Sequence, residues 1–398
     1  MEMNLLGSAD LEDRSVLLRV DFNVPLADGK VSDDTRIKAT LPTIKYILEK
    51  NAKLIIISHL GRPKGEEKKE LSLNLVADKL QTYLPNKVNF INKTIGDDVK
   101  KAVNELALGE ILVLENLRFH SEEKSNDEAF AKSLASLADI YVNDAFGVSH
   151  RAHASVNALP ILMGEKAYAG FLLEKELKIA KKLLESPESP FTAIIGGSKV
   201  SDKIGVIKSL LEKVDHLIIG GGMANTFLNA KGYSVGKSLY EPDKVDLAKE
   251  LIQLAKELSV DMHLPSDVVT AKEFAPTAEP HYFDVDEIPE DEMVLDIGPD
   301  TCDCFSDVIK NSKLVIWNGP VGVFEMEAFS VGTRTIAAVL SASDAEVIIG
   351  GGDSAAAITQ FGYVDDMNHI STGGGAFLEL IEGKTLPGVE ALSKTRRD

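Results

Sequence analysis

The sequence predicts an α/β protein of two lobes, each built on a parallel sheet that is covered by helices. Short apolar runs alternate with amphipathic stretches along the chain, and this alternation occurs in two separate blocks. Apolar strands that alternate with helices are typical of parallel sheets buried on both faces. The length also favours two lobes, because 398 residues correspond to roughly two to three domains of average size.

The first block predicts one Rossmann-like sheet within residues 1–170. Its apolar runs, which we interpret as strands, cover residues 16–22, 53–58, 111–115 and 139–143, and the amphipathic stretches at 36–50, 72–84 and 127–138 are predicted to be helices.

A single helix is predicted to link the two blocks at residues 171–185, where apolar residues recur with the helical period. The next segment, SPESP at 186–190, contains two prolines, which stop a helix. Residues 171–190 are therefore expected to form a linking helix and a hinge.

The second block repeats the pattern and predicts another Rossmann-like sheet within residues 191–379. Its strands are expected at 192–197, 216–221, 313–319 and 346–351, and its helices at 203–213, 243–258 and 330–342. The acidic stretch at 283–292 is expected to be a solvated loop.

The charge balance argues against a general role in binding polyanions. Lysine and arginine total 43, and aspartate and glutamate total 62, so the net charge is −19. A field of this sign repels nucleic acids and anionic membrane surfaces, and the chain has no run of about 18 apolar residues that would span a bilayer. The start of the chain lacks the features of a signal peptide, and a disulfide between Cys302 and Cys304 would be badly strained. We therefore expect a cytoplasmic protein with no nucleic-acid or membrane partner.

The arginines gather in the first half, where six of the nine lie between residues 14 and 151. Several follow predicted strands directly, at the sheet edge where ligands of α/β proteins bind. The polar residues at these positions are Asp21, Asn23, His59, Arg62, Arg118 and Arg151. Arg36 joins them from a predicted helix start, where an arginine opposes the helix dipole and so suggests another role. One such arginine is usually a surface residue, and Asp21 with Asn23 also fits an ordinary strand-end turn. Together, the set predicts an anion pocket.

The glycine runs gather in the second half, at predicted junctions between a strand and a helix. They cover residues 196–197, 220–222, 350–352 and 373–375. After the first run, Lys199 and Lys203 are expected on one face of the first turns of a helix, beside backbone N–H groups that attract phosphates. Asp353 and Ser354 follow the run at 350–352, and Asp353 fits either a ligand of Mg²⁺ or a plain N-cap. The second half is therefore predicted to bind the phosphates of a nucleotide.

Two other classes of site find less support. His150 and His153 lie three residues apart, but no carboxylate or cysteine completes a metal-ligand set. The glycine runs lack the G-x-G-x-x-G pattern that a nicotinamide-dependent dehydrogenase needs. A non-catalytic nucleotide-binding or scaffold protein on this fold stays open at this point.

Seven motifs in order between residues 19 and 377 resemble the phosphoglycerate kinase family. They are RVDFNVP, SHLGRP, LENLRF, HRAH, GGSKVSDK, WNGPVGVFE and GGGDSA. The resemblance implies a two-lobed monomer that catalyses a step of glycolysis. The step is reversible, in-line phosphoryl transfer from 1,3-bisphosphoglycerate to ADP, giving 3-phosphoglycerate and ATP, with Mg²⁺ and closure of the lobes.

The resemblance also assigns residues, with Arg36 and Lys199 as the catalytic pair. The phosphoglycerate would be bound in the first lobe by Asp21, Asn23, Arg36, His59, Leu60, Gly61, Arg62, Arg118 and Arg151. The nucleotide would be bound in the second lobe by Lys203, Glu325, Gly351, Gly352, Asp353 and Ser354, with Asp353 on the metal. The tail, residues 380–398, would pack back on the first lobe.

Overall fold

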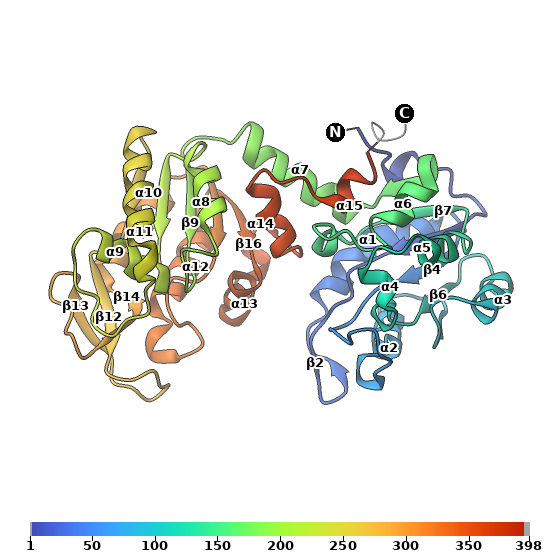
Figure 1. The fold of residues 1–398 in the computed structure, drawn as a ribbon, viewed down its shortest axis with the longest axis horizontal. Coiled ribbons are helices and arrows are strands. Elements are labelled where there is room, and N and C mark those ends of the chain that lie inside the picture. Colours follow the sequence, from blue (N-terminus) through green and yellow to red (C-terminus); the bar gives the residue numbers. More distant parts are fainter. Residues whose placement is uncertain (1, 394–398) are drawn as a thin grey trace. The chain divides into compact units, whose positions relative to one another are not determined.

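The computed structural model describes residues 2–393, which form two compact units (Figure 1). Unit 1 contains residues 2–179 together with 385–393, and unit 2 contains residues 180–384. Each unit holds a parallel sheet with helices around it, which confirms the predicted fold class. The predicted domain limits, and the role of 171–190 as a hinge, stay predictions.

Unit 1 is built on six parallel strands in the order β5-β6-β4-β1-β7-β8. They are β1 (Ser15–Arg19), β4 (Lys53–Ile57), β5 (Val88–Ile91), β6 (Ile111–Leu114), β7 (Ile140–Asn143) and β8 (Ala167–Ala169). The four apolar runs of the first block are confirmed as the central strands. Sequence analysis missed the two edge strands, because β5 is only half-buried and β8 has three residues.

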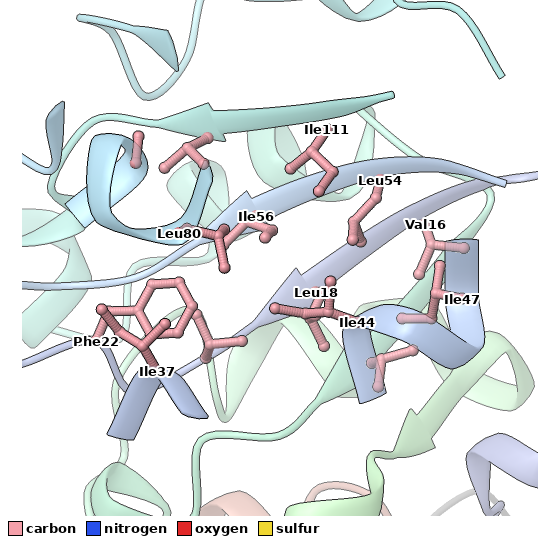
Figure 2. Packing of buried hydrophobic residues seen from close by; sticks show 14 of the residues in the cluster. Val16, Leu18, Phe22, Ile37, Ile44, Ile47, Leu54, Ile56, Leu80 and Ile111 are labelled. Carbon is pink, nitrogen blue, oxygen red and sulfur yellow. The ribbon is translucent and has the colours of Figure 1, made fainter. Parts of the chain in front are cut away.

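The helices of unit 1 include the three that were predicted. They are α1 (Thr35–Glu49), α2 (Asn74–Gln81), α3 (Asp97–Glu105), α4 (Ser121–Lys124), α5 (Glu128–Ala135) and α6 (Ala158–Met163), while α7 (Phe171–Glu185) begins in unit 1 and ends in unit 2. Figure 2 shows apolar side chains of α1 and α2, such as Ile44 and Leu80, meeting those of β1, β4 and β6 in one buried cluster. Full burial of one such side chain contributes about 1.5–3 kcal/mol. This core fixes the strand ends that carry the candidate site.

The C-terminal segment lies against unit 1 and includes the short helix α15 (Pro387–Glu390). The Gly388 N–H donates to the Ser149 carbonyl (2.8 Å), and Asn157 Nδ2 donates to the Pro387 carbonyl (3.1 Å). Of the predicted tail, residues 394–398 lie outside the described residues.

Unit 2 is built on a second sheet of six parallel strands, in the order β11-β10-β9-β15-β16-β17. They are β9 (Phe191–Ile195), β10 (His216–Ile219), β11 (Asp261–His263), β15 (Leu314–Asn318), β16 (Glu346–Gly350) and β17 (His369–Ile370). The helices of unit 2 are α8 (Ile204–Leu211), α9 (Gly222–Ala230), α10 (Val245–Glu257), α11 (Pro299–Lys310), α12 (Val331–Ala342), α13 (Gly352–Phe361) and α14 (Gly375–Ile381). The four predicted strands of this block are confirmed, and again they are central.

A small antiparallel sheet in unit 2 corrects one expectation. Its strands β12 (Asp267–Ala271), β13 (His281–Asp284) and β14 (Met293–Ile297) lie in the order β13-β12-β14. The stretch 283–292 is therefore not wholly a solvated loop: it begins inside β13, and its Val285 and Ile288 are buried. Those two side chains join a local apolar cluster, which outweighs the acidic residues around them.

The helix predicted over 171–185 is confirmed as α7, with the same limits. None of the helices in residues 2–393 is both long and apolar enough to cross a membrane.

Candidate functional site

The polar strand ends of unit 1 meet at one edge of its sheet. Asp21 and Asn23 follow β1, His59 and Arg62 follow β4, and Arg118 follows β6. These strands are parallel, so their carboxyl ends lie on the same side. The segment with Arg151 follows β7, which pairs with β1 in the same direction.

Hydrogen bonds tie three of these segments together. Arg36 Nη1 is 2.8 Å from Asp21 Oδ2, and it also donates to the Asn23 carbonyl at 3.3 Å. Asn23 Oδ1 accepts from the Gly61 N–H at 2.8 Å, and Arg118 Nη1 donates to the Gly61 carbonyl at 2.9 Å. Gly61 has a φ of +62°, a conformation that glycine adopts without strain. The site is thus preorganised by its own strand-end residues.

Beneath these residues lies a buried ion pair that sequence analysis missed. Arg19, the last residue of β1, is fully buried, and its Nη2 lies 4.0 Å from Glu123 Oε1 and 3.3 Å from His59 Nδ1. Ser155 completes the network, because its Oγ accepts from Arg19 Nε at 2.7 Å and donates to Glu123 Oε1 at 2.6 Å. A buried charge persists only with such partners. The signal in the sequence was an arginine inside an apolar strand, but its partner 104 positions away was not detectable.

The positive charges around this edge depress the pKa values of their neighbours. Burial, followed by Arg19, Arg118 and Arg36, holds the pKa of His59 well below its usual value. Burial and the nearby Arg19 lower the pKa of Arg118 to about 10. Both pKa values are lowered because burial and the neighbouring arginines make a further positive charge at this edge unfavourable. An anionic ligand is the natural partner of this cluster.

Arg62 and Arg151 are exposed, and neither side chain forms a hydrogen bond or ion pair among the contacts described for residues 2–393. Arg62 contributes to the lowered pKa of Arg118, and Arg151 to that of His153, so both act on the same cluster. Leu60, also assigned to the site, is buried, and its N–H donates to Asn116 Oδ1 at 3.2 Å.

The buried His59 predicts an acid-sensitive fold. Its folded pKa is depressed, so below the unfolded value of 6.5 the unfolded chain binds a proton that the folded chain does not. Stability is therefore present above that value and is lost as the pH falls. The free energy of unfolding should therefore fall as the pH is lowered from 7 to 5. Urea unfolding measures this free energy at each pH, and it should fall less in His59→Asn than in the wild type. An equal dependence on pH in the two proteins would contradict the expectation.

In unit 2, the expected placement of the two lysines on a helix is wrong. α8 begins at Ile204, so Lys203 only flanks it and Lys199 lies in the preceding turn segment. The physical reason is a distant contact: Glu241 accepts from the backbone N–H of Ser201 at 3.0 Å and from its hydroxyl. These bonds hold the segment in a turn that the local pattern does not reveal.

The two lysines have different surroundings. Lys203 donates to Asn318 Oδ1 at the end of β15, and burial lowers its pKa, although Asp353 acts in the opposite direction. Asn318 is itself fixed by donating from Nδ2 to the Gly350 carbonyl at 2.7 Å. Lys199 is exposed, with no hydrogen bond or ion pair among the contacts described for residues 2–393. Lys203 therefore lies near Asp353, while Lys199 is free to meet a ligand.

The glycine run at 350–352 leads directly into α13. Gly351 has a φ of +93°, and a Cβ there would lie 2.8 Å from Asn318 Nδ2, so the position favours glycine. Gly351 is the N-cap, with Gly352 and the exposed Asp353 in the first turn, so Asp353 is not a plain N-cap. Ser354 is buried, and its Oγ accepts from the Gly319 N–H at 2.6 Å. Asp353 thus stays available to a ligand beside the helix N-terminus.

A pocket of about 680 Å³ opens beside these residues. Asp353 and Glu325 both line it, and so do the glycines of the first two runs, such as Gly197 and Gly221. Its apolar lining includes Leu239 and Phe274, which are 54% and 62% exposed. Sequence analysis missed both apolar residues. Large exposed apolar side chains in a pocket are suited to covering a flat ligand.

The family described as phosphoglycerate kinase matches residues 6–384. A curated phosphoglycerate kinase of Moorella thermoacetica is 54% identical over 389 residues, which cover 98% of each chain. The solved phosphoglycerate kinase structure from Coxiella burnetii has a TM-score of 0.89 at 41% identity and covers 100% of both chains. That from Pyrococcus horikoshii OT3 has a TM-score of 0.86 at 32% identity, covering 99% of this chain and 100% of the other.

Proposed function

Because the chain belongs to the phosphoglycerate kinase family and is a phosphotransferase of glycolysis, we propose how its two units divide the reaction. The phosphoglycerate binds to the arginine edge of unit 1, and the Mg-nucleotide binds in the pocket of unit 2. The single observation that supports this division is that the two kinds of binding residue lie in different units. The clustered arginines lie in unit 1, and the apolar pocket beside Asp353 and Lys203 lies in unit 2.

On unit 1, the cations that lack protein partners would hold the phosphate of 1,3-bisphosphoglycerate or 3-phosphoglycerate. Arg62 and Arg151 are exposed for this purpose, and the guanidinium fork suits phosphate oxygens. Asp21, Asn23 and His59 would meet the hydroxyl and carboxyl groups, with Leu60, Gly61 and Arg118 shaping the site. The hydrogen bonds that already join Asn23, Gly61 and Arg118 support this assignment.

On unit 2, the base of ADP or ATP would lie between Leu239 and Phe274, and Glu325 would accept hydrogen bonds from the ribose hydroxyls. The phosphates would reach the start of α13, where Gly351, Gly352 and Ser354 lie beside Lys203. The N-terminus of a helix favours negative charge, and Lys203 adds a full cation. The exposed apolar surface inside the pocket supports the base position.

Asp353 is the residue we assign to Mg²⁺. Magnesium usually keeps phosphate and water oxygens and takes only one or two protein carboxylates. Among residues 2–393, no group of three or more His, Cys, Asp or Glu side chains is arranged to hold a metal alone, so the donors fit an ion shared with the nucleotide. When bound, Mg²⁺ neutralises charge on the phosphates. Asp353 would orient the phosphate chain toward Lys199.

No general base is needed for this transfer. An oxygen of the ADP β-phosphate forms the new bond to phosphorus, and the bond that breaks releases the carboxylate of 3-phosphoglycerate, which is a stable anion at neutral pH. No proton moves, so catalysis depends on in-line positioning and on cations around the transferring group. Arg36 and Lys199 are the two cations that we assign to this role.

The division of ligands requires the two units to approach each other during the reaction. The reacting atoms must come within about 3–3.5 Å, and water must be kept from the acyl phosphate. We propose that closure occurs about residues 171–190, as hinge motions do in other kinases. We also propose a cytoplasmic monomer: the monomer is what the family resemblance implies, and the two free thiols fit a reducing compartment.

A coupled assay for ATP formation from 1,3-bisphosphoglycerate and ADP tests the proposed function as a whole. Turnover should require both substrates and should stop when a chelator removes Mg²⁺. ATP formation that is unchanged by the chelator would contradict the role of Asp353. Nucleotide binding without turnover would instead favour a non-catalytic protein on this fold.

A further inference from the structure

Asp296 is a buried carboxylate of unit 2 that the proposed mechanism does not use. It lies on β14 and is 2% exposed. Its Oδ2 accepts from the Gly332 N–H at 2.7 Å, and its Oδ1 accepts from the Ile297 N–H at 2.9 Å. Gly332 is in the first turn of α12. The carboxylate therefore joins β14 to the start of that helix.

A third element also packs on this carboxylate. A Cβ added at Gly322 would lie 1.9 Å from Asp296 Oδ1, so the backbone there is in direct contact with the carboxyl group. Gly322 belongs to the loop 319–326, which supplies Pro320, Val321, Val323 and Glu325 to the pocket wall. The Val323 N–H also donates to the Leu295 carbonyl on β14 at 2.8 Å. The loop is thus bonded to the backbone of β14 and packs against the Asp296 side chain.

We propose that Asp296 is a positioning residue for nucleotide binding. Its carboxylate is bonded to the start of α12 and contacts Gly322, and so fixes the position of the loop 319–326 and of the pocket wall that carries Glu325. This inference rests on the proposed nucleotide site of unit 2.

The chemistry of the position requires two acceptor oxygens. Burial raises the pKa of Asp296 to about 7, while the N–H groups of Gly332 and Ile297 act to lower it. An asparagine of the same shape has one acceptor oxygen, so its NH₂ group would face one of the two N–H donors. A buried donor left unpaired in this way displaces the backbone that carries it. The displaced backbone would be that of α12 or of β14, which both border the loop.

Asp267 provides a matched control in the same small sheet. It is also buried, it accepts from the N–H groups of Thr301 and Asp300 at the start of α11, and Gly298 packs on it as Gly322 packs on Asp296. The difference is that Asp296 lines the nucleotide pocket and Asp267 does not. A purely structural role predicts similar effects from both asparagine variants.

Calorimetric titration with Mg-ADP tests the proposal. Asp296→Asn should weaken binding about tenfold or more, while Asp267→Asn should stay within twofold of the wild type. The KM for ADP should rise in Asp296→Asn, and the KM for the phosphoglycerate should not. Equal weakening in both variants, or wild-type affinity in Asp296→Asn, would overturn the proposal. If the wild type itself fails to bind Mg-ADP, then the proposed nucleotide site fails instead.

Gly322→Ala keeps the proposal testable if Asp296→Asn does not fold. The added methyl group would overlap the carboxylate from the loop side, so the loop 319–326 or the carboxylate has to move. The same weakening of Mg-ADP binding is expected, with phosphoglycerate affinity unchanged. Wild-type affinity for Mg-ADP in a folded Gly322→Ala protein would contradict the proposed contact.

Discussion

Replacing Arg36 or Lys199 by alanine is expected to lower kcat by a factor of about 10²–10³, which is the usual loss when one donor to a developing charge is removed. Both would act on the transferring phosphoryl group. Arg36 is held by Asp21 and the Asn23 carbonyl, yet its side chain is 33% exposed and so can reach a ligand. Lys199 is exposed in the turn before α8.

Steady-state kinetics with matched controls would check this expectation. Arg14→Ala and Lys208→Ala remove exposed cations of the same units that the account leaves without a catalytic role, and their kcat should be unchanged. Neither catalytic variant should lose much folded stability, because Lys199 has no described partner and the Arg36 ion pair is partly exposed. A kcat near that of the wild type in either variant would remove that residue from the role.

The second large effect is a separation of ligand affinities between the units. Arg62→Ala should weaken phosphoglycerate binding by about tenfold or more and leave Mg-ADP affinity nearly unchanged, because it removes a charge-assisted contact from one site only. Lys203→Ala should do the reverse. Calorimetry with each ligand alone measures both affinities on each variant.

Two further variants repeat this comparison. Arg151→Ala should behave like Arg62→Ala, and Asp353→Ala should behave like Lys203→Ala. Because Lys203 bonds to Asn318, its loss could also disturb the end of β15; Asp353 has no such bond described and gives the cleaner result. Crossed effects of similar size would contradict the assignment of one ligand to each unit.

The central strands and the strand-end residues were predictable from sequence because the signal for each is local. A run such as KLIII fixes β4, and the residues that follow it, including His59 and Arg62, must then lie at the carboxyl edge. The same reasoning placed Asp21 after β1 and Asp353 after β16. The place of such residues is predictable because a residue that directly follows a parallel strand lies at the carboxyl edge of the sheet.

The features that sequence analysis missed depend on contacts between distant residues. Arg19 forms an ion pair with Glu123. Glu241 binds Ser201 in the turn before α8, so Lys199 lies in that turn and not on the helix. Phe274 lies in the segment between β12 and β13, and β13 runs into the acidic stretch that sequence analysis interpreted as a loop. Tertiary packing, rather than local propensity, decides all three.

The most direct test of the account is solution scattering on the wild type with each ligand alone and with both. If the two ligands bind different units, each alone should shift the conformational equilibrium only in part. The radius of gyration should therefore fall most when 3-phosphoglycerate and the Mg-nucleotide are present together. An unchanged radius of gyration in the active ternary complex would contradict the account.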